Sequence, residues 1–176
     1  FTVDRQQINP GECVTFYWNT RNASTVYFYR DNGLATAKPV EANPDHFSAC
    51  PPRTSTHYLH VIGKDGLIEI RAIRIWVGEQ QAGGPGPVIP TFTAIPDSLT
   101  ANRRCTTLNW TTGGSGLTAV TLYRNGQPLT NQNAASPYQD CVPDSVLGRD
   151  IVYELKVDSE FSGWTSRQVR VTSPRG

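Results

Sequence analysis

Methionine and long hydrophobic runs are both missing from this chain of 176 residues. No apolar stretch approaches the roughly 20 residues that a membrane-spanning helix needs, so we expect no membrane span in this segment. The missing methionine leads us to expect a mature or excised segment, with any targeting sequence outside it. An excess of either charge is missing too, because 16 Lys and Arg stand against 15 Asp and Glu. Nucleic-acid-binding domains normally carry a basic patch or stripe, so this balance argues against nucleic acid as a partner.

Motifs that carry chemistry are also missing. The sequence has no HExxH, no GxGxxG and no phosphate-binding GxxxxGK[ST]. His57 and His60 are three residues apart on an expected strand, so they lie on opposite faces and cannot share a metal ion. Ser115 lies in a Gly-rich stretch that lacks the final Gly of a nucleophile elbow. We therefore predict that the chain is not an enzyme and has no cofactor or metal.

The cysteines are few, and they form no CxxC pair, which argues against a zinc ribbon or a thioredoxin-type redox site. The four are Cys13, Cys50, Cys105 and Cys141. An even number without metal spacing indicates two structural disulfides and an oxidising compartment. We therefore expect an extracellular or cell-surface location.

What the sequence does contain is an internal repeat. Three pairs of segments correspond in the same order along the chain: Cys13–Trp18 with Cys105–Trp110, Val26–Arg30 with Val120–Arg124, and Ile73–Ile75 with Val169–Val171. The second cysteine of each copy follows the first at almost the same spacing. Such ordered landmarks indicate a duplication, and hence two domains of the same kind.

A Pro- and Gly-rich stretch separates the two copies and has the composition of a linker. Its Gly residues permit bending, whereas Pro85, Pro87 and Pro90 favour an extended chain. We predict a first domain over residues 1–78, a linker over residues 79–91 centred near residue 84, and a second domain over residues 92–176.

Within each copy, alternating hydrophobic and polar residues predict short strands with one buried face. Val14, Phe16 and Trp18 share one face, and the segment Tyr153–Val157 alternates strictly. Asp31-Asn-Gly33 and similar Asp-Gly and Asn-Gly pairs supply hairpin turns between such segments. About seven short strands per copy, without an amphipathic helix, predict an all-β chain of two β-sandwiches.

The Trp in the second strand and the Tyr-x-Leu-x-Val pattern of the sixth resemble fibronectin type III domains and the related bacterial immunoglobulin-like repeats of extracellular surface proteins. The resemblance covers both copies. It implies cores built on Trp18 and Trp110, with Tyr153 at the tyrosine-corner position and His57 as its counterpart in the first copy.

The cysteines depart from the antibody pattern, in which the bridge crosses the core. Cys13 and Trp18 are five residues apart, so on one strand they point to opposite faces, and the same holds for the second copy. Together with the repeat symmetry, this predicts peripheral bridges Cys13–Cys50 and Cys105–Cys141, although four cysteines allow three connectivities. Closing each loop is worth about 4 kcal/mol in the chain-entropy model.

Aromatic side chains supply the candidate interaction face. If Val26 and Phe28 point inward, alternation turns five residues outward on neighbouring strands of domain 1: Tyr27, Tyr29, Tyr58, His60 and Trp76. We predict that they form one solvent-facing patch, and clustered exposed aromatics tend to mark interaction sites. The corresponding positions of the second copy are mainly polar.

Three interpretations of this patch stay open at the level of sequence. It is an interface with another molecule, or it is covered within the chain by the linker or by domain 2, or it consists of exposed cross-strand pairs that only stabilise the sheet.

The sequence favours a non-catalytic extracellular module: an adhesive, structural or spacer part of a surface protein or filament. The expected partner is a protein, including a second copy of the chain, or a surface polysaccharide. The alternatives are a carbohydrate-binding accessory module of a secreted hydrolase and a receptor-like ectodomain that binds a protein ligand.

Overall fold

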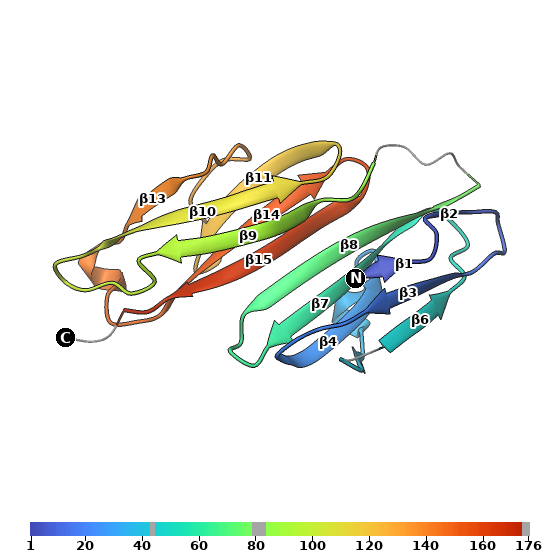
Figure 1. The fold of residues 1–176 in the computed structure, drawn as a ribbon, viewed down its shortest axis with the longest axis horizontal. Helices are drawn as coiled ribbons and strands as arrows, with labels where there is room; N and C mark the ends of the chain where they lie inside the picture. The colour runs from blue at the N-terminus through green and yellow to red at the C-terminus, as the bar shows by residue number, and fades with distance from the viewer. Residues whose placement is uncertain (43–44, 79–83, 174–176) are drawn as a thin grey trace.

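The computed structural model describes residues 1–42, 45–78 and 84–173. These residues form two β-sandwiches that lie one after the other along the long axis of the molecule (Figure 1). Each sandwich packs a three-stranded sheet against strands of one long sheet, which runs through both domains. The predicted all-β architecture of two tandem immunoglobulin-like or fibronectin type III-like sandwiches is confirmed.

Domain 1 contributes strands to both kinds of sheet. Its three-stranded sheet has the order β1 (Thr2–Val3), β3 (Val14–Trp18), β6 (Asp45–Ala49). Its part of the long sheet contains β5 (Pro39–Val40), β4 (Ala23–Arg30), β7 (Ser55–Gly63) and β8 (Ile68–Val77), and β2 (Gln7–Ile8) runs parallel to the end of β8. A short 3-10 helix, η1 (Gly33–Thr36), connects β4 to β5.

Domain 2 repeats this plan. Its three-stranded sheet has the order β9 (Val88–Ile95), β10 (Cys105–Gly113), β13 (Tyr138–Cys141). Its part of the long sheet contains β12 (Gln127–Pro128), β11 (Leu117–Arg124), β14 (Ile151–Ser159) and β15 (Gly163–Val171), and η2 (Asp144–Val146) precedes β14.

Each domain has its own hydrophobic core, as the alternation predicted. Phe16 and Trp18 are buried in domain 1, and Trp18 stacks on Phe28 with ring centroids 5.5 Å apart. Trp110 and the fully buried Leu155 belong to the core of domain 2. The two Trp residues of the repeat therefore anchor the two cores.

The predicted linker overlaps a strand. β9 already begins at Val88, inside the range 79–91, and residues 79–83 lie outside the described part of the chain. Pro90 favoured a linker by its composition, but it lies in β9. This is an edge strand, where a residue without an N–H group is tolerated. The ladder between β9 and β10 also shifts register between Thr111 and Gly113, next to this proline.

The two disulfides are Cys13–Cys50 and Cys105–Cys141, the pairs that the repeat predicted. Both join neighbouring strands of a three-stranded sheet rather than the two sheets, and Cys105 lies directly opposite Cys141 in the ladder. Both lie at the periphery of the sandwich, as predicted. The bridges fasten the edge strands β6 and β13, which have no further strand beside them in the described residues.

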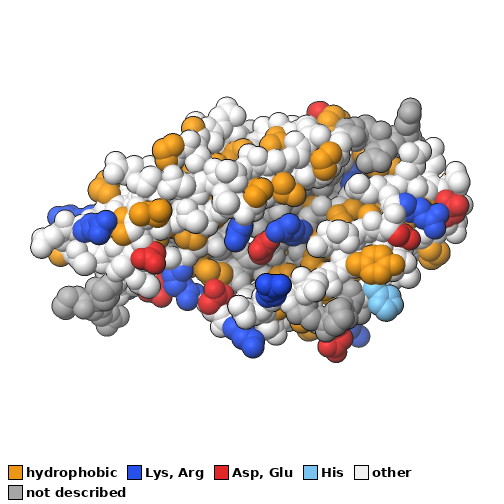
Figure 2. Space-filling model, in the orientation of Figure 1, with side chains coloured by type: hydrophobic (Ala, Val, Ile, Leu, Met, Phe, Trp, Pro, Cys, Tyr) orange, Lys and Arg blue, Asp and Glu red, His pale blue; other side chains and the backbone are white. Residues whose placement is uncertain are grey.

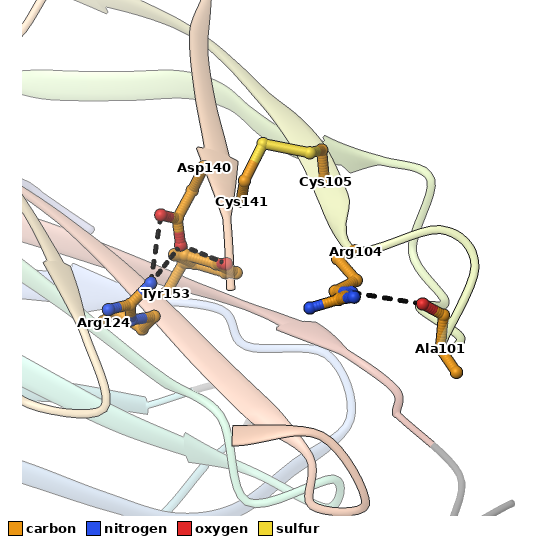
Figure 3. Close-up of a disulfide and its surroundings, with 7 residues drawn as sticks. All are labelled: Ala101, Arg104, Cys105, Arg124, Asp140, Cys141 and Tyr153. Atoms are coloured by element: carbon orange, nitrogen blue, oxygen red, sulfur yellow. Dashed lines mark hydrogen bonds and ion pairs between the residues drawn. A yellow bond between two sulfur atoms is a disulfide. The ribbon is translucent and has the colours of Figure 1, made fainter. Parts of the chain in front are cut away.

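Tyr153, the residue expected at the tyrosine-corner position, bonds through its hydroxyl to a side chain. The fully buried Tyr153 donates its hydroxyl hydrogen bond to Asp140 Oδ2 at 2.7 Å, so its partner is a carboxylate on β13 rather than a backbone group. Arg124 Nη1 contacts both oxygens of the same carboxylate at 3.0 and 2.8 Å. Figure 3 shows these three side chains meeting beside the Cys105–Cys141 bridge. The network neutralises a buried acid and ties three strands of domain 2 together.

At the position in domain 1 that corresponds to Tyr153, the side chain is uncharged. His57 takes the place of the tyrosine, and its ring lies 4.7 Å from that of Phe16 and 5.8 Å from that of Phe28. Burial, assisted by Arg30, lowers the pKa of His57 to about 4. The ring is therefore neutral at pH 7 and packs as an aromatic core residue.

Candidate functional site at the domain junction

The two domains are joined edge to edge. β8 of domain 1 pairs antiparallel with β15 of domain 2 through Ile70↔Ser166 and Glu69↔Arg167. We call this ladder, with the side chains packed over it, the seam. Directly paired residues project to the same face of a sheet, so both three-stranded sheets cover the same face of the long sheet.

The seam has local two-fold symmetry. In the repeat Ile73 corresponds to Val169, and the same offset makes Ser166 the counterpart of Ile70. These two counterparts are paired with each other. Equivalent edges of the two copies therefore meet as they would in an isologous dimer, but within one chain.

An aromatic cluster covers the seam on the face away from the three-stranded sheets. Tyr29, Tyr58 and Ile70 of domain 1 are buried here, and Trp164 of domain 2 packs against them. The ring of Tyr58 lies 5.3 Å from that of Tyr29 and 5.5 Å from that of Trp164. Lys156 Nζ lies 5.1 Å from the centre of the Trp164 ring. Domain 2 thus supplies an aromatic side chain to a cluster that domain 1 begins.

The structure places the five predicted residues on the face that alternation indicated, but the expected exposure is wrong. Tyr29, Tyr58, His60 and Trp76 retain 7–9% of their accessible surface, and Tyr27 is half-buried. Alternation predicts only which face of the sheet a side chain lies on. Docking of domain 2 then covers much of that face. Of the three interpretations, cover within the chain is the one that the geometry favours.

Trp76 lies apart from the other four. It is at the far end of β8, where β2 runs alongside and Gln7 is its ladder neighbour. The Arg74 guanidinium lies 4.7 Å from its ring centre. The cover of Trp76 therefore comes from domain 1 itself, and the residue is not part of the seam.

Polar contacts across the seam support the apolar ones. The Ile68 N–H donates across the seam to Gln168 Oε1 at 3.1 Å, and within domain 2 Gln168 Nε2 donates to Glu154 Oε2 at 3.2 Å. The Thr165 hydroxyl donates to the Ile70 carbonyl, and Arg170 Nη2 donates to the Asp65 carbonyl at 2.6 Å. Hydrogen bonds thus extend the short backbone ladder in both directions.

Two glycines allow the close approach. Gly163 has φ +82°, and a Cβ there would lie 2.8 Å from Tyr58 Oη and 2.9 Å from Thr56 Cγ2. A Cβ at Gly86 would lie 3.2 Å from Ser162 Cβ and 3.4 Å from the Ala72 carbonyl oxygen. Gly86, within the range predicted as linker, therefore lies close both to β8 and to the turn between β14 and β15.

Burial in the seam perturbs the titratable groups. It raises the pKa of Tyr29 to about 12, with a further contribution from Tyr58. Burial also raises the pKa of Tyr58, to which Asp31 and Asp158 add. Burial lowers the pKa of His60, against an opposing effect of Glu154. All three groups are thus held in their neutral forms at pH 7.

A polar groove lies on the other face of the seam, where three neighbouring hollows of about 390, 270 and 340 Å³ share residues of β8. Arg71 Nη2 forms an ion pair with Glu69 at 2.6 Å. Arg167 Nη1 donates to the carbonyls of Ile89 at 3.3 Å and Pro90 at 3.0 Å. Figure 2 shows basic and acidic side chains together near the middle of this view. Within the groove, Arg71 is therefore paired with an acid, and Arg167 is held by backbone carbonyls of β9.

Sequence reasoning missed Trp164 and Gly163. Both residues lie upstream of Val169–Val171, the repeat landmark of the last strand, so the repeat does not relate them to the aromatic face of domain 1. A Gly-Trp pair at the start of a strand of the second copy was the available signal. Its meaning depends on the docking of the domains, which the sequence pattern does not contain.

Chemical groups for metal binding do not gather anywhere in the described ranges, since no three His, Cys, Asp or Glu side chains form a cluster that could hold an ion. In the same part of the chain, no helix has the length and apolar character that crossing a bilayer requires.

Comparison with known proteins adds fold-level likeness only. No family model matches the sequence, and no curated protein matches it significantly. Among solved structures, the fibronectin(III)-like modules of Clostridium thermocellum CbhA match 98% of this chain and 93% of theirs, with 13% identity and a TM-score of 0.38.

Two other solved structures illustrate the range of the matches. A chimeric titin Z1Z2 tandem covers 99% of both chains with 12% identity and a TM-score of 0.45. A bacterial ice-binding adhesin covers 96% of this chain and 60% of its own, with 15% identity and a TM-score of 0.31. The CbhA modules are fibronectin(III)-like, and immunoglobulin domains of Dscam1 and Sidekick-1 match as well.

Proposed function

We propose that the chain is a rigid, non-catalytic spacer in an extracellular surface protein or filament. The observation that carries this proposal is the seam, in which the aromatic face of domain 1 is used to fix domain 2. Domains joined by a small polar contact move relative to one another by default. A backbone ladder, an aromatic cluster and several hydrogen bonds oppose that motion here.

The two exposed disulfide-stapled edges support the extracellular setting. Disulfides persist in oxidising compartments, and they stabilise small domains mainly by restricting the unfolded chain. Two small sandwiches that share one long sheet would fix the distance and the angle between the parts of the parent protein on either side of them. Other parts of the parent protein would then contact its protein or polysaccharide partner.

The carbohydrate-binding alternative is less well supported by the geometry. Stacking on a sugar ring needs an accessible aromatic face, and Tyr29, Tyr58 and Trp76 are buried. A receptor-like role at the bend between the domains would need a hinge, and the seam restricts that movement.

Nuclear magnetic relaxation of the backbone amides tests the proposal. A rigid spacer gives one rotational correlation time for both domains at neutral pH, and small-angle scattering gives a maximum dimension that matches the docked pair. Separate, shorter correlation times for the two domains would refute the spacer role. The same experiment at two protein concentrations checks for self-association.

A further inference from the structure

His60 occupies an unusual place in the seam. It lies on β7 between Tyr27 of β4 and Ile70 of β8, and Ile70 is itself paired with Ser166 of domain 2. The side chain is 9% exposed, and both ring nitrogens are buried without a hydrogen-bond partner among the described residues. A buried polar group without a partner is rare and calls for an explanation.

The groups that face His60 offer little to a charged imidazole. On its own domain these are the Tyr27 ring, edge-on with its centroid at 5.9 Å, and the aliphatic Ile70. From domain 2, Glu154 on β14 acts on the ring electrostatically, and Ser166 on β15 lies one strand beyond Ile70. Glu154 is the one charged group with a resolved effect on His60, and its Oε2 already accepts a hydrogen bond from Gln168.

We propose that protonation of His60 opens the seam, so that mild acid converts the rigid unit into two domains linked only by the connecting segment. The inference rests on the spacer role proposed above, since it regulates the same seam. In the open state the imidazolium is hydrated, and the aromatic face of domain 1 becomes accessible. The seam is then a bistable element that a buried His biases.

The direction of the effect follows from linkage. Burial lowers the pKa of His60 in the docked state, and this outweighs the opposing effect of Glu154. In the open state the exposed ring returns towards its ordinary pKa of about 6.5. Above that pH neither state binds the proton, and docking is unaffected. Below it the open state binds the proton first, so the opening constant rises by up to about tenfold per pH unit until the docked ring also titrates.

A second histidine must be separated from this effect. His57 lies in the core of domain 1, and its protonation destabilises the domain itself rather than the seam. Domain integrity therefore needs its own probe. The indole N–H of Trp18 donates to the Glu41 carbonyl at 2.9 Å within domain 1, whereas the Trp164 indole belongs to the seam cluster.

The experiment compares the whole chain at pH 7.5 and pH 5 by amide relaxation and small-angle scattering, with the indole signals of Trp18 and Trp164 as internal reporters. The variants are His60→Leu and His60→Gln, which remove the titrating ring with and without polarity. His46→Gln is the matched control, because it removes an exposed imidazole of the same domain. All four proteins are measured on one pH series.

In the expected result, the wild type and His46→Gln lose their common correlation time and expand as the pH falls, with the Trp164 signal shifting and the Trp18 signal unchanged. Both His60 variants stay docked, or open to a degree that is independent of pH. The proposal is overturned if the wild type stays docked at pH 5, or if the His60 variants open as the wild type does. Independent tumbling already at pH 7.5 would overturn the spacer role as well, whereas a seam closed at every pH would leave that role standing.

Discussion

Substituting alanine for Gly163 tests whether close packing holds the seam shut. The new Cβ would lie 2.8 Å from Tyr58 Oη and 2.9 Å from Thr56 Cγ2, both on domain 1. Tyr58 has little freedom to retreat, because its ring stacks on Tyr29 and also packs against the tilted ring of Trp164. The relief available is a separation of the two domains.

The magnitude has two parts. Gly163 has φ +82°, and an L-residue in a left-handed conformation costs roughly 1–2 kcal/mol, which lowers the stability of domain 2 alone. Overpacking costs about 2 kcal/mol and would raise the opening constant of the seam roughly thirtyfold. The two parts act on different equilibria and are measured separately.

Gly126→Ala is the matched control for the first part. Gly126 lies in another turn of domain 2 with φ +79°, and a Cβ there meets nothing within 4 Å. Both variants are expected to lower the melting temperature of domain 2 by a similar amount. Only Gly163→Ala should lose the common correlation time and increase the radius of gyration at pH 7.5. If Gly163→Ala tumbles as one body like the control, the reasoning about the seam fails.

Three further predictions concern the individual domains. Asp140→Ala leaves Arg124 and the Tyr153 hydroxyl without their buried partner, so domain 2 should lose about 3–5 kcal/mol of unfolding free energy in urea titrations. The pKa of His57 is lowered to about 4, so its contribution to domain 1 is fully present above pH 6.5 and falls with pH towards 4, by about 3 kcal/mol in all. Reducing both disulfides should lower the melting temperature of each domain, with a loss of roughly 4 kcal/mol per bridge in the chain-entropy model.

Each of these has a clear contrary outcome. Asp144 pairs with Arg104 at the surface, so Asp144→Ala should have almost no effect, and an equal loss in both variants would contradict the burial argument. A His57→Phe variant should have a flatter pH dependence of domain 1 stability than the wild type. Unchanged melting after reduction, with free thiols confirmed by mass, would remove the stabilising role of the bridges.

The fold was largely predictable because it depends on local patterns that occur twice. Alternation located the buried faces of the strands around Trp18 and Trp110, and the repeated spacing of the cysteines predicted their pairing. The beginning of β9 was not predicted, because Pro90 belongs to a Pro- and Gly-rich stretch that is typical of a linker. An edge strand nevertheless tolerates a proline.

The candidate site was predictable only in part. Alternation correctly turned Tyr29 and Tyr58 away from the core of domain 1, but it could not say what lies over them. Their burial depends on the pairing of β8 with β15, a contact between residues about 100 positions apart in the chain. The partner side chain, Trp164, has no equivalent among the repeat landmarks, so symmetry could not reveal it.

The local two-fold axis between Ile70 and Ser166 relates two copies that belong to one chain, so even a weak contact can hold the seam closed. Two separate copies that met through so short a ladder would lose translational and rotational freedom on association, which opposes docking. A short tether replaces dilution with an effective concentration in the millimolar range. Duplication thus makes docking independent of how much protein is present, and the two halves can contribute unequally to the seam: Tyr29 and Tyr58 from domain 1, and Trp164 from domain 2.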